Sequence, residues 1–288
     1  MPPNKTLRVL AASLMLAAFA GCSPQETPAP AATATTGLAC GKAQLRTLTA
    51  GKLTIGTDEP VYPPWFVDNK PENGQGFEGA VAQALATKLG YTAGEVAWVR
   101  VPFNNAIAPG PKTFDFDINE FSITEERKAA VDFSAPYYDV TQAVVALKNN
   151  KIGSATTLAQ LKTAKLGAQV GTTSLKAITE VVQPTTQPSV YNNNDDAKAA
   201  LQNGTIDGLV LDLPTAFFVT AAEIDNSAII GQLPQPSGQP EQFGLVLDKG
   251  STLTPCISQA VESLRADGTL KRLEDQWLAQ VAGAPVLS

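Results

Sequence analysis

From Leu53 onward, short apolar runs of strand type alternate with amphipathic stretches of helical period. This alternation is typical of an α/β fold built on parallel strands. We expect a strand at residues 53–56, a helix at 79–89 that stops at Gly90, and a strand at 96–101. The pattern starts again after Asn150. The sequence therefore predicts two α/β lobes of similar size, with the functional surface in the cleft between them.

The remaining expected elements follow from caps and apolar periodicity. Thr124 is a good N-cap for a helix that ends near Val131, because Glu125 and Glu126 then face the positive end of the helix dipole. In the second half of the body, Thr172 opens one helix and Pro214 lies in the first turn of another. The other predicted elements are strands at 117–119, 166–170, 206–211 and 243–247, and helices at 157–161, 196–202, 253–266 and 269–278.

Composition excludes several classes of function. The chain has 288 residues, of which 44% are hydrophobic and 17% charged, so it can bury a sizeable core. Its formal charge of −6 argues against a nucleic-acid partner. The sequence has no histidine, which removes Ser-His-Asp catalysis and histidine-ligated metals. We expect no cofactor and no metal.

The first residues have the layout of a secretory signal peptide. Lys5 and Arg8 precede an apolar run that ends near Ala20 and is too short to span a bilayer. The segment Phe19-Ala20-Gly21-Cys22 resembles a bacterial lipobox, although Phe19 departs from the usual Leu. We expect a lipoprotein signal peptide at residues 1–21 and lipidation at Cys22; the alternative is an ordinary signal peptide with an incidental Cys22. Residues 22–39 are rich in Pro, Ala and Thr, which predicts a flexible tether.

Two further cysteines stand at the two ends of the body. Cys40 begins it and Cys256 precedes its last helices. In an exported chain a disulfide between them is expected, and their spacing has no zinc-ligand pattern. The alternative is a pair of unpaired buried thiols.

Several motifs along the body together resemble one known family. They are Gly56-Thr57-Asp58 with Tyr62-Pro63-Pro64-Trp65, Gly76-Phe77-Glu78-Gly79, Ser122-Ile123-Thr124-Glu125-Glu126-Arg127, Pro136-Tyr137-Tyr138, Gly171-Thr172-Thr173-Ser174, Asp207-Gly208 with Asp212, and Arg265-Ala266-Asp267-Gly268-Thr269-Leu270. The set is similar to the extracytoplasmic solute-binding proteins of amino-acid ABC transporters, bacterial family 3. The resemblance covers essentially the whole body.

This resemblance implies a type II periplasmic-binding-protein fold, in which the second lobe is inserted into the first. It places the first lobe at 40–147 and 246–288, the second at 148–245, and the hinges near 146–150 and 243–247. It further implies a monomeric, non-catalytic receptor outside the cytoplasm. Such a receptor would be lipid-anchored to the membrane, bind a free amino acid and deliver it to the permease subunits of an ABC importer.

The resemblance also suggests how each end of an amino acid is held. Arg127 matches the family's carboxylate-binding residue, and its planar guanidinium can donate two parallel bonds; by itself it would be read as a surface residue. Thr172 and Thr173 open a helix whose free N–H groups suit the same carboxylate, although Thr172 could be a simple N-cap. Asp212 resembles the ammonium-binding residue, with Ser122 adding a hydroxyl or carbonyl oxygen. The alternative for Asp212 is a cap for the next helix.

The pocket for the ligand side chain depends on four residues. Asp58 matches a position that contacts polar side chains, and Tyr62 and Trp65 are expected to form an apolar or cation–π wall. Tyr62 stands one residue further from Asp58 than in many relatives, and a core aromatic is the alternative for Trp65. Glu120 departs from the family's usual small residue. If it faces the cleft, its buried charge calls for a cationic ligand; the alternative is a glutamate turned to solvent.

Charge balance therefore favours arginine, lysine or ornithine, with glutamine as the runner-up. The rival from another class is an enzyme on the same fold, similar to the cyclohexadienyl dehydratases. Such an enzyme needs a general acid in the cleft, and Glu120 is the obvious candidate.

Overall fold

The computed structural model describes residues 40–235, 238–279 and 283–288. The predicted signal peptide, the lipidation site Cys22 and the whole of the predicted tether lie outside these ranges. Within them, no helix is both long enough and apolar enough to cross a membrane. The described strands form two larger mixed sheets and one small two-stranded sheet.

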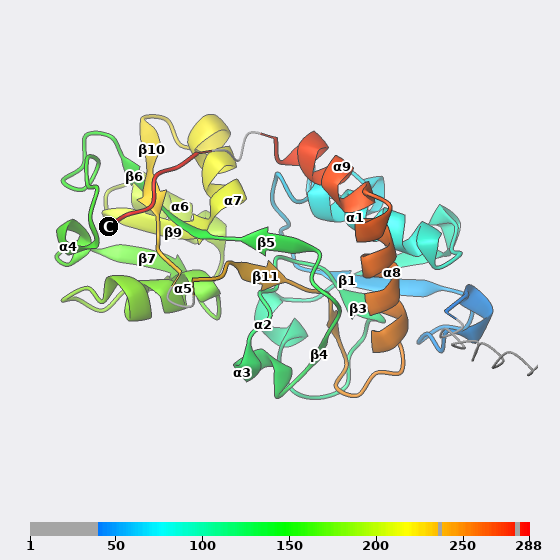
Figure 1. Ribbon diagram of the computed structural model, residues 1–288. Coiled ribbons are helices and arrows are strands. Elements are labelled where there is room, and N and C mark those ends of the chain that lie inside the picture. The colour runs from blue at the N-terminus through cyan, green and yellow to red at the C-terminus, as the bar shows by residue number, and fades with distance from the viewer. Residues whose placement is uncertain (1–39, 236–237, 280–282) are drawn as a thin grey trace, which may run out of the picture. The chain divides into compact units, whose positions relative to one another are not determined.

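The first sheet has the strand order β2-β1-β3-β12-β4, and we call it with its helices the first lobe (Figure 1). Strands β1, β2 and β3 run parallel, and β12 pairs antiparallel with β3 and β4. The elements of this lobe are β1 (Leu53–Thr57), α1 (Phe77–Lys88), β2 (Val96–Arg100), α2 (Phe103–Ala106), β3 (Phe116–Asp117), α3 (Glu125–Lys128), β4 (Asp132–Phe133), β12 (Val246–Leu247), α8 (Thr254–Ala266) and α9 (Thr269–Trp277).

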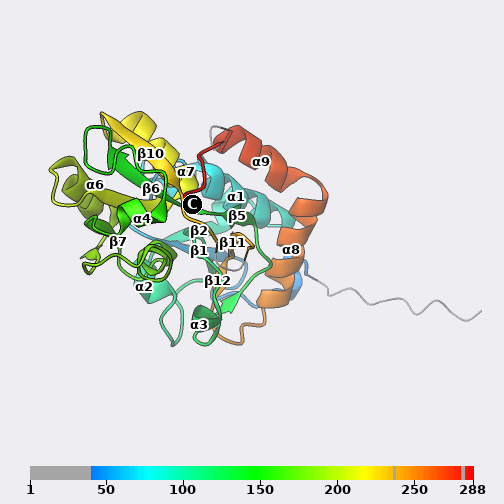
Figure 2. The same cartoon turned by 60° about the vertical axis from the view of Figure 1, so that its left-hand side comes forward.

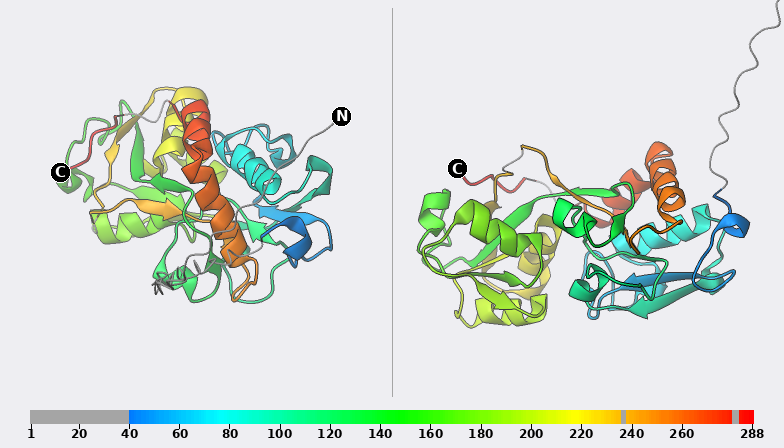
Figure 3. Two further views of the ribbon diagram at one scale, coloured as in Figure 1. Left: turned by 45° about the vertical axis from the view of Figure 1, so that its right-hand side comes forward. Right: turned by 90° about the horizontal axis from the view of Figure 1, so that it is seen from below.

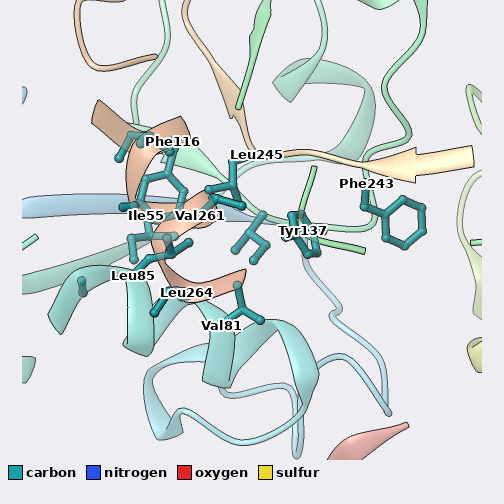
Figure 4. Close-up of a cluster of buried hydrophobic side chains, with 14 of the residues drawn as sticks. Ile55, Val81, Leu85, Phe116, Tyr137, Phe243, Leu245, Val261 and Leu264 are labelled. Carbon is teal, nitrogen blue, oxygen red and sulfur yellow. The ribbon is translucent and has the colours of Figure 1, made fainter. Parts of the chain in front are cut away.

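The main core of this lobe lies between the sheet and helices α1, α8 and α9. Helix α1 turns Val81 and Leu85 inward, where they meet Ile55 from β1 and Val261 and Leu264 from α8 (Figure 4). All of these side chains are buried. Burying each of them contributes on the order of 1.5 to 3 kcal/mol, so the apolar positions that predict the helix also hold it on the sheet.

The second sheet has the order β10-β6-β9-β7-β8 and forms, with its helices, the second lobe. Apolar clusters cover both of its faces, which explains the continuous apolar runs of β6 and β9. The elements are β6 (Gln142–Leu147), α4 (Leu158–Leu161), β7 (Leu166–Gln169), α5 (Thr173–Ala177), β8 (Ser189–Tyr191), α6 (Asn194–Gln202), β9 (Gly208–Asp212), α7 (Leu213–Phe218) and β10 (Ser227–Gln232).

Two paired strands join the lobes. Strand β5 (Tyr138–Val140) and strand β11 (Glu241–Phe243) run antiparallel to each other between the two sheets (Figures 1 and 3). The hinge expected near 146–150 therefore needs correction, whereas the one expected near 243–247 begins at Phe243, the last residue of β11. The first crossing lies earlier, because β6 pairs with β9 and β10 and is buried in the second sheet.

The single strand expected at 243–247 is also wrong. It is divided between β11 and β12, which belong to different sheets, and Gly244 lies between them with its N–H donating to Phe121 O. A side chain at Gly244 would meet Ile123 at 2.8 Å, so the chain passes close to the Ser-Ile-Thr segment at this point.

The C-terminal residues differ from the expected lobe assignment. Residues 246–288 were assigned to the first lobe, but Val286 forms a parallel bridge with Gln232, the last residue of β10. Leu287 is buried in a core cluster of the second lobe. The chain thus returns to the second lobe after α9.

The predicted disulfide is confirmed. Cys40 and Cys256 are bonded, with their Cα atoms 5.2 Å apart, so the start of the body is fastened to α8.

Candidate functional site

A pocket between the two lobes brings together most of the residues singled out in the sequence. Asp58, Tyr62, Glu120, Arg127, Thr172, Thr173 and Asp212 line it. Trp65 and Ser122 are buried and lie outside the pocket lining. The other lining residues are Pro60, Phe103, Asn119, Gln169, Ser174, Asn194, Leu211 and Thr215.

Arg127 lies in the short helix α3, one turn after its N-cap. The Thr124 hydroxyl accepts a hydrogen bond from Arg127 N at 3.2 Å, as the predicted cap requires. The guanidinium donates to Ser122 O at 2.7 Å and, across the pocket, to Gly171 O at 2.9 Å. Its carbon Cζ lies 5.4 Å from the centre of the Phe103 ring. Arg127 is only 8% exposed, so it is not the surface residue that its position in a first helical turn would suggest.

On the opposite side of the pocket, helix α5 begins at Thr173. The Thr172 hydroxyl accepts from Leu175 N at 3.2 Å and donates to Gln169 O at 2.8 Å, so Thr172 is an N-cap. The first N–H groups of a helix have no partner within it, and here they begin at the pocket wall. This arrangement can accept a carboxylate.

Asp212 ends β9 and precedes α7. It stands at the N-cap position of α7 but makes no side-chain cap bond to that helix, so its carboxylate does not serve as a cap. Instead Oδ1 accepts from Gln142 Nε2 at 2.7 Å, and Gln142 Oε1 accepts from the Ser174 hydroxyl at 2.6 Å. The Gln142 amide thereby fixes the orientation of the carboxylate.

Trp65 belongs to the aromatic core rather than to the pocket wall. Its ring is fully buried and packs edge-on against Phe77, Tyr138 and Phe243. Its indole N–H donates to the Thr215 hydroxyl at 2.8 Å, and Thr215 does line the pocket. Trp65 therefore borders the pocket through one hydrogen bond.

Glu120 points inward, so the alternative of a glutamate turned to solvent is wrong. Its backbone is left-handed, with φ of 53°, and its N–H donates to the buried Glu78 carboxylate at 2.7 Å. The Tyr137 hydroxyl also donates to Glu78. With its backbone held in this way, Glu120 turns Oε2 toward Thr215, whose hydroxyl donates to it at 3.2 Å.

Burial is the main cause of the raised pKa values in this cluster. It raises the pKa of Asp212 to about 8, with the nearby Glu241 adding to the effect. It raises the pKa of Glu78 to about 7 and holds that of Glu120 well above its usual range, with Asp212 and Glu78 as further causes. The pKa of Asp58 is raised for the same reason, although backbone N–H groups partly oppose the shift.

The lobes contact each other all around this pocket. The Ser122 hydroxyl lies 3.1 Å from that of Thr173, and Lys198 Nζ lies 4.9 Å from the centre of the Tyr62 ring. Together with Arg127–Gly171 and Trp65–Thr215, these contacts connect residues far apart in sequence. Any ligand between them would be enclosed by both lobes.

Gly171 allows the lobes to approach at the Arg127 contact. Its φ is +76°, and a Cβ built there would lie 1.9 Å from Asn104 Oδ1. A side chain at this position therefore conflicts with both the backbone conformation and the first lobe.

Several residues that line the pocket or support its side chains were not predicted. Thr215 and Gln142 gave no signal, because a threonine after a helix-opening proline and a glutamine in a strand are ordinary residues. Phe103 was not singled out in the sequence. The pattern that could have pointed to them is position, since α2 follows β2 and α7 follows β9 at the carboxyl edges of their sheets.

No group of acidic or cysteine side chains among the described residues is arranged to hold a metal ion. The polar groups of the pocket instead suit a small charged molecule.

Comparison with known proteins agrees with this geometry. The family model of bacterial extracellular solute-binding proteins, family 3, matches residues 53–280. From Escherichia coli strain K12, the L-cystine-binding protein TcyJ is 28% identical over 79% of this chain and 82% of its own length. ABC transporter arginine-binding protein 1 of the same strain is 29% identical over 80% of this chain and 92% of its own.

Solved structures of an ancestral arginine-binding protein, one bound to arginine and one to glutamine, are both 33% identical with a TM-score of 0.67. They cover 79% and 80% of this chain and 98% of theirs.

Proposed function

The chain belongs to the bacterial extracellular solute-binding proteins, family 3, and on that premise we propose that it binds a free amino acid with a cationic side chain. It delivers this amino acid to the permease of an ABC importer. The fold is the two-lobe, type II fold of that family, and the named relatives are binding proteins for arginine and cystine.

The observation that carries this proposal is the placement of Arg127 and Asp212. They come from different lobes and line the same pocket. An amino acid has a carboxylate and an ammonium close together, and each needs an opposite charge once water is excluded. In our proposal Arg127 and the first N–H groups of α5 receive the carboxylate, while Asp212 receives the ammonium. Ser122 assists from behind the pocket wall.

The preference for a cationic side chain follows from the remaining charges. Among the pocket-lining residues that the structure describes, Arg127 is the one basic side chain, whereas Asp58, Glu120 and Asp212 are acidic. Once Asp212 is paired with the ligand ammonium, Asp58 and Glu120 remain. A guanidinium or ammonium at the end of the ligand side chain would neutralise them, whereas a ligand carboxylate would add like charge.

Glutamine is the alternative ligand, since its amide could donate to Asp58 while Glu120 stays protonated. The raised pKa of Glu120 makes a neutral side chain compatible with the pocket as well. One of the two similar ancestral structures holds glutamine and the other arginine, so both ligands are included in the test.

Location and anchoring complete the proposal. We propose that residues 1–21 are removed on export and that Cys22 carries a lipid which holds the receptor, as a monomer, beside its permease. These residues lie outside the described part of the structure. Mass spectrometry of the mature protein would test the proposal: an N-terminal diacylglyceryl cysteine supports it, and an unmodified Cys22 in the mature chain contradicts it.

Calorimetry with L-arginine, L-lysine, L-ornithine, L-glutamine and L-glutamate tests the ligand class. We expect the cationic amino acids to bind with the highest affinity, glutamine more weakly and glutamate not at all. If glutamine binds more tightly than every cationic amino acid, the charge-balance argument is wrong. If no amino acid binds, the receptor proposal itself fails.

The second candidate is a dehydratase resembling the cyclohexadienyl dehydratases. The raised pKa of Glu120 favours it, because a protonated carboxyl in an enclosed pocket can serve as a general acid. Incubation with prephenate or arogenate decides between the two: turnover that Glu120→Gln abolishes would establish the enzyme, and the receptor proposal expects none.

A further inference from the structure

The chain crosses between the lobes a third time, after its last helix. Leu278 follows α9 and is buried in the first-lobe core. Ala284 packs against the core of the second lobe, and Leu287 is 2% exposed in another cluster of that lobe. In Figures 1 and 2 the red segment at the C-terminal end of the chain lies at the edge of the second sheet beside β10. We call residues 284–288 the C-terminal strap.

Gln232 holds the strap at the end of β10. Its side-chain Nε2 donates to Ala284 O at 2.6 Å, and its backbone N donates to Pro285 O at 2.7 Å. Its carbonyl accepts from Leu287 N at 2.9 Å. Gln232 thus makes three hydrogen bonds to the strap, and all three partners are backbone groups of the strap.

Gln232 also lies beside the two chain segments that lead to the crossing strands β5 and β11. Its Oε1 accepts from the Thr141 hydroxyl at 2.6 Å, and Thr141 directly follows β5. The next residue, Leu233, donates its N–H to Gln142 O at 2.8 Å, at the start of the segment that leads to β11. The strap is therefore attached where both connections enter the second lobe.

The far end of the strap is anchored separately. Ser288 O accepts from Leu158 N at 2.9 Å, which ties it to the start of α4. Leu287 packs over Gly231, where an added Cβ would lie 2.7 Å from its Cγ. Burying one leucine contributes roughly 1.5 to 3 kcal/mol, in addition to these hydrogen bonds, so the strap is not a loose end.

The chain that connects Leu278 in the first lobe to Ala284 in the second lobe is short. Six residue steps separate Leu278 from Ala284, and a fully extended chain covers at most about 3.3 to 3.6 Å per residue, or about 20 to 22 Å in total. Both ends are fixed in packed cores. A rotation about β5 and β11 that would separate these two anchors by more than this reach must either stop or pull the strap off the second sheet.

We propose that the C-terminal strap, clamped by Gln232, limits how far the second lobe can rotate away from the first when the pocket is empty. Hinge closure around a ligand is the general motion of two-lobe binding proteins. Two crossing strands by themselves do not limit how far the lobes separate. A third tie restricts the open states. Fewer open states lower the entropic cost of closing and therefore favour ligand binding.

The test measures opening in the ligand-free protein, so it does not depend on which amino acid binds. Spin labels are introduced as noncanonical amino acids at the exposed residues Glu72 and Gln187, one in each lobe, and the disulfide remains intact. Pulsed electron paramagnetic resonance gives the distribution of distances between them. Three proteins are compared: wild type, a chain ending at Gly283, and a chain with about six Gly and Ser residues inserted between Gly283 and Ala284, which adds roughly 20 Å of reach.

We expect longer and broader distance distributions in both variants than in wild type. The lengthened variant keeps every anchor, so its melting temperature should match that of wild type and its result stands even if the truncated chain folds poorly. With L-arginine as probe, both variants should bind several-fold more weakly than wild type. Unchanged distributions in the lengthened variant would overturn the proposal, including the case in which only truncation widens them, since the strap would then act by packing alone.

Discussion

Glu120, from the first lobe, accepts a hydrogen bond at 3.2 Å from the hydroxyl of Thr215, which belongs to the second lobe. The same hydroxyl accepts the indole N–H of Trp65 at 2.8 Å. The Thr215 hydroxyl thus donates one hydrogen bond to Glu120 and accepts another from Trp65. In this way it links an acidic group of the pocket to the aromatic core. The acid that most distinguishes this pocket thus takes part in the contact between the lobes.

Replacing Arg127 with alanine should abolish most amino-acid binding. A ligand carboxylate would be left without its partner in an enclosed pocket, at a cost of about 2 to 5 kcal/mol. Calorimetry with L-arginine measures the loss. Lys128→Ala is the matched control, because Lys128 is exposed on the same short helix. Equal affinities for Arg127→Ala and wild type would exclude Arg127 as the carboxylate partner.

Glu120→Gln should weaken the binding of L-arginine more than the binding of L-glutamine. The substitution keeps an acceptor for Thr215 but removes the charge, and a hydrogen bond to a charged group contributes about 1.5 to 3 kcal/mol. The informative quantity is the ratio of the two affinities at two salt concentrations. A ratio that stays at its wild-type value would show that Glu120 does not select the ligand side chain.

Binding of L-arginine should release protons near neutral pH. A cation in the pocket favours the ionised form of the acids around it, whose pKa values are raised in the empty pocket, to about 8 for Asp212. Affinity should therefore increase as pH rises from about 6 to about 8. Calorimetry in buffers with different ionisation enthalpies counts the protons. Uptake of protons on binding, or no net proton exchange with the buffer, would contradict the expectation that the pocket acids ionise when L-arginine binds.

The ligand-free protein should become less stable over a similar pH range. Glu78 and Asp212 have folded-state pKa values of about 7 and about 8, above those of the unfolded chain. The folded state then holds more protons than the unfolded state, so this contribution to stability is full at low pH and is lost as pH rises through these values. Melting temperatures between pH 5 and pH 8 measure it. A melting temperature that rises steadily over this interval would oppose the prediction.

Asp117 offers a matched comparison with Asp115 on the stability of buried acids. Both oxygens of Asp117 are buried and have no hydrogen-bond partner among the residues that the structure describes, and burial holds its pKa well above the usual range. Asp115, by contrast, accepts from Leu48 N and Thr54 N at 2.7 Å each. Asp117→Asn should raise the melting temperature at pH 8 and have less effect at pH 5, whereas Asp115→Asn should cost about 1 to 3 kcal/mol. A similar loss of stability in the Asp117→Asn and Asp115→Asn variants would contradict this prediction.

Reduction of the Cys40–Cys256 bond should lower the melting temperature more than the ligand affinity. The bond closes a long loop, with a sequence separation of 216, and such a crosslink contributes roughly 2 to 5 kcal/mol to stability. Neither cysteine lines the pocket. Thermal unfolding and calorimetry, each with and without reductant, provide the comparison. If reduction lowered the ligand affinity as strongly as the melting temperature, the disulfide would also support the binding site.

Local signals predicted much of the fold. Thr124 caps α3, Thr172 caps α5 and Pro214 lies in the first turn of α7, as expected. These succeed because a cap or a proline acts within one turn of helix. The motifs that resemble family 3 also pointed to most of the residues that line the pocket, although Trp65 and Ser122 lie outside its lining.

Long-range pairing could not be predicted in the same way. Strand β6 carries an apolar run that fits either lobe, and only its pairing with β9 and β10 assigns it to the second. Trp65 follows a motif that suggests a pocket wall, yet its ring packs in the core because Phe243, from a distant crossing strand, lies beside it. In neither case does the neighbouring sequence contain the decisive partner.

The disulfide also determines where a mechanical load enters the body. Everything that precedes Cys40 in the chain is attached to it, and Cys40 is bonded to the beginning of α8 in the first lobe. A pull applied through the N-terminal side therefore passes into the first lobe at two covalent points. Neither β5 nor β11 lies on that path, so tension through the proposed lipid anchor would leave both crossing strands unloaded. The second lobe could then rotate within the reach of the strap while the first lobe is held.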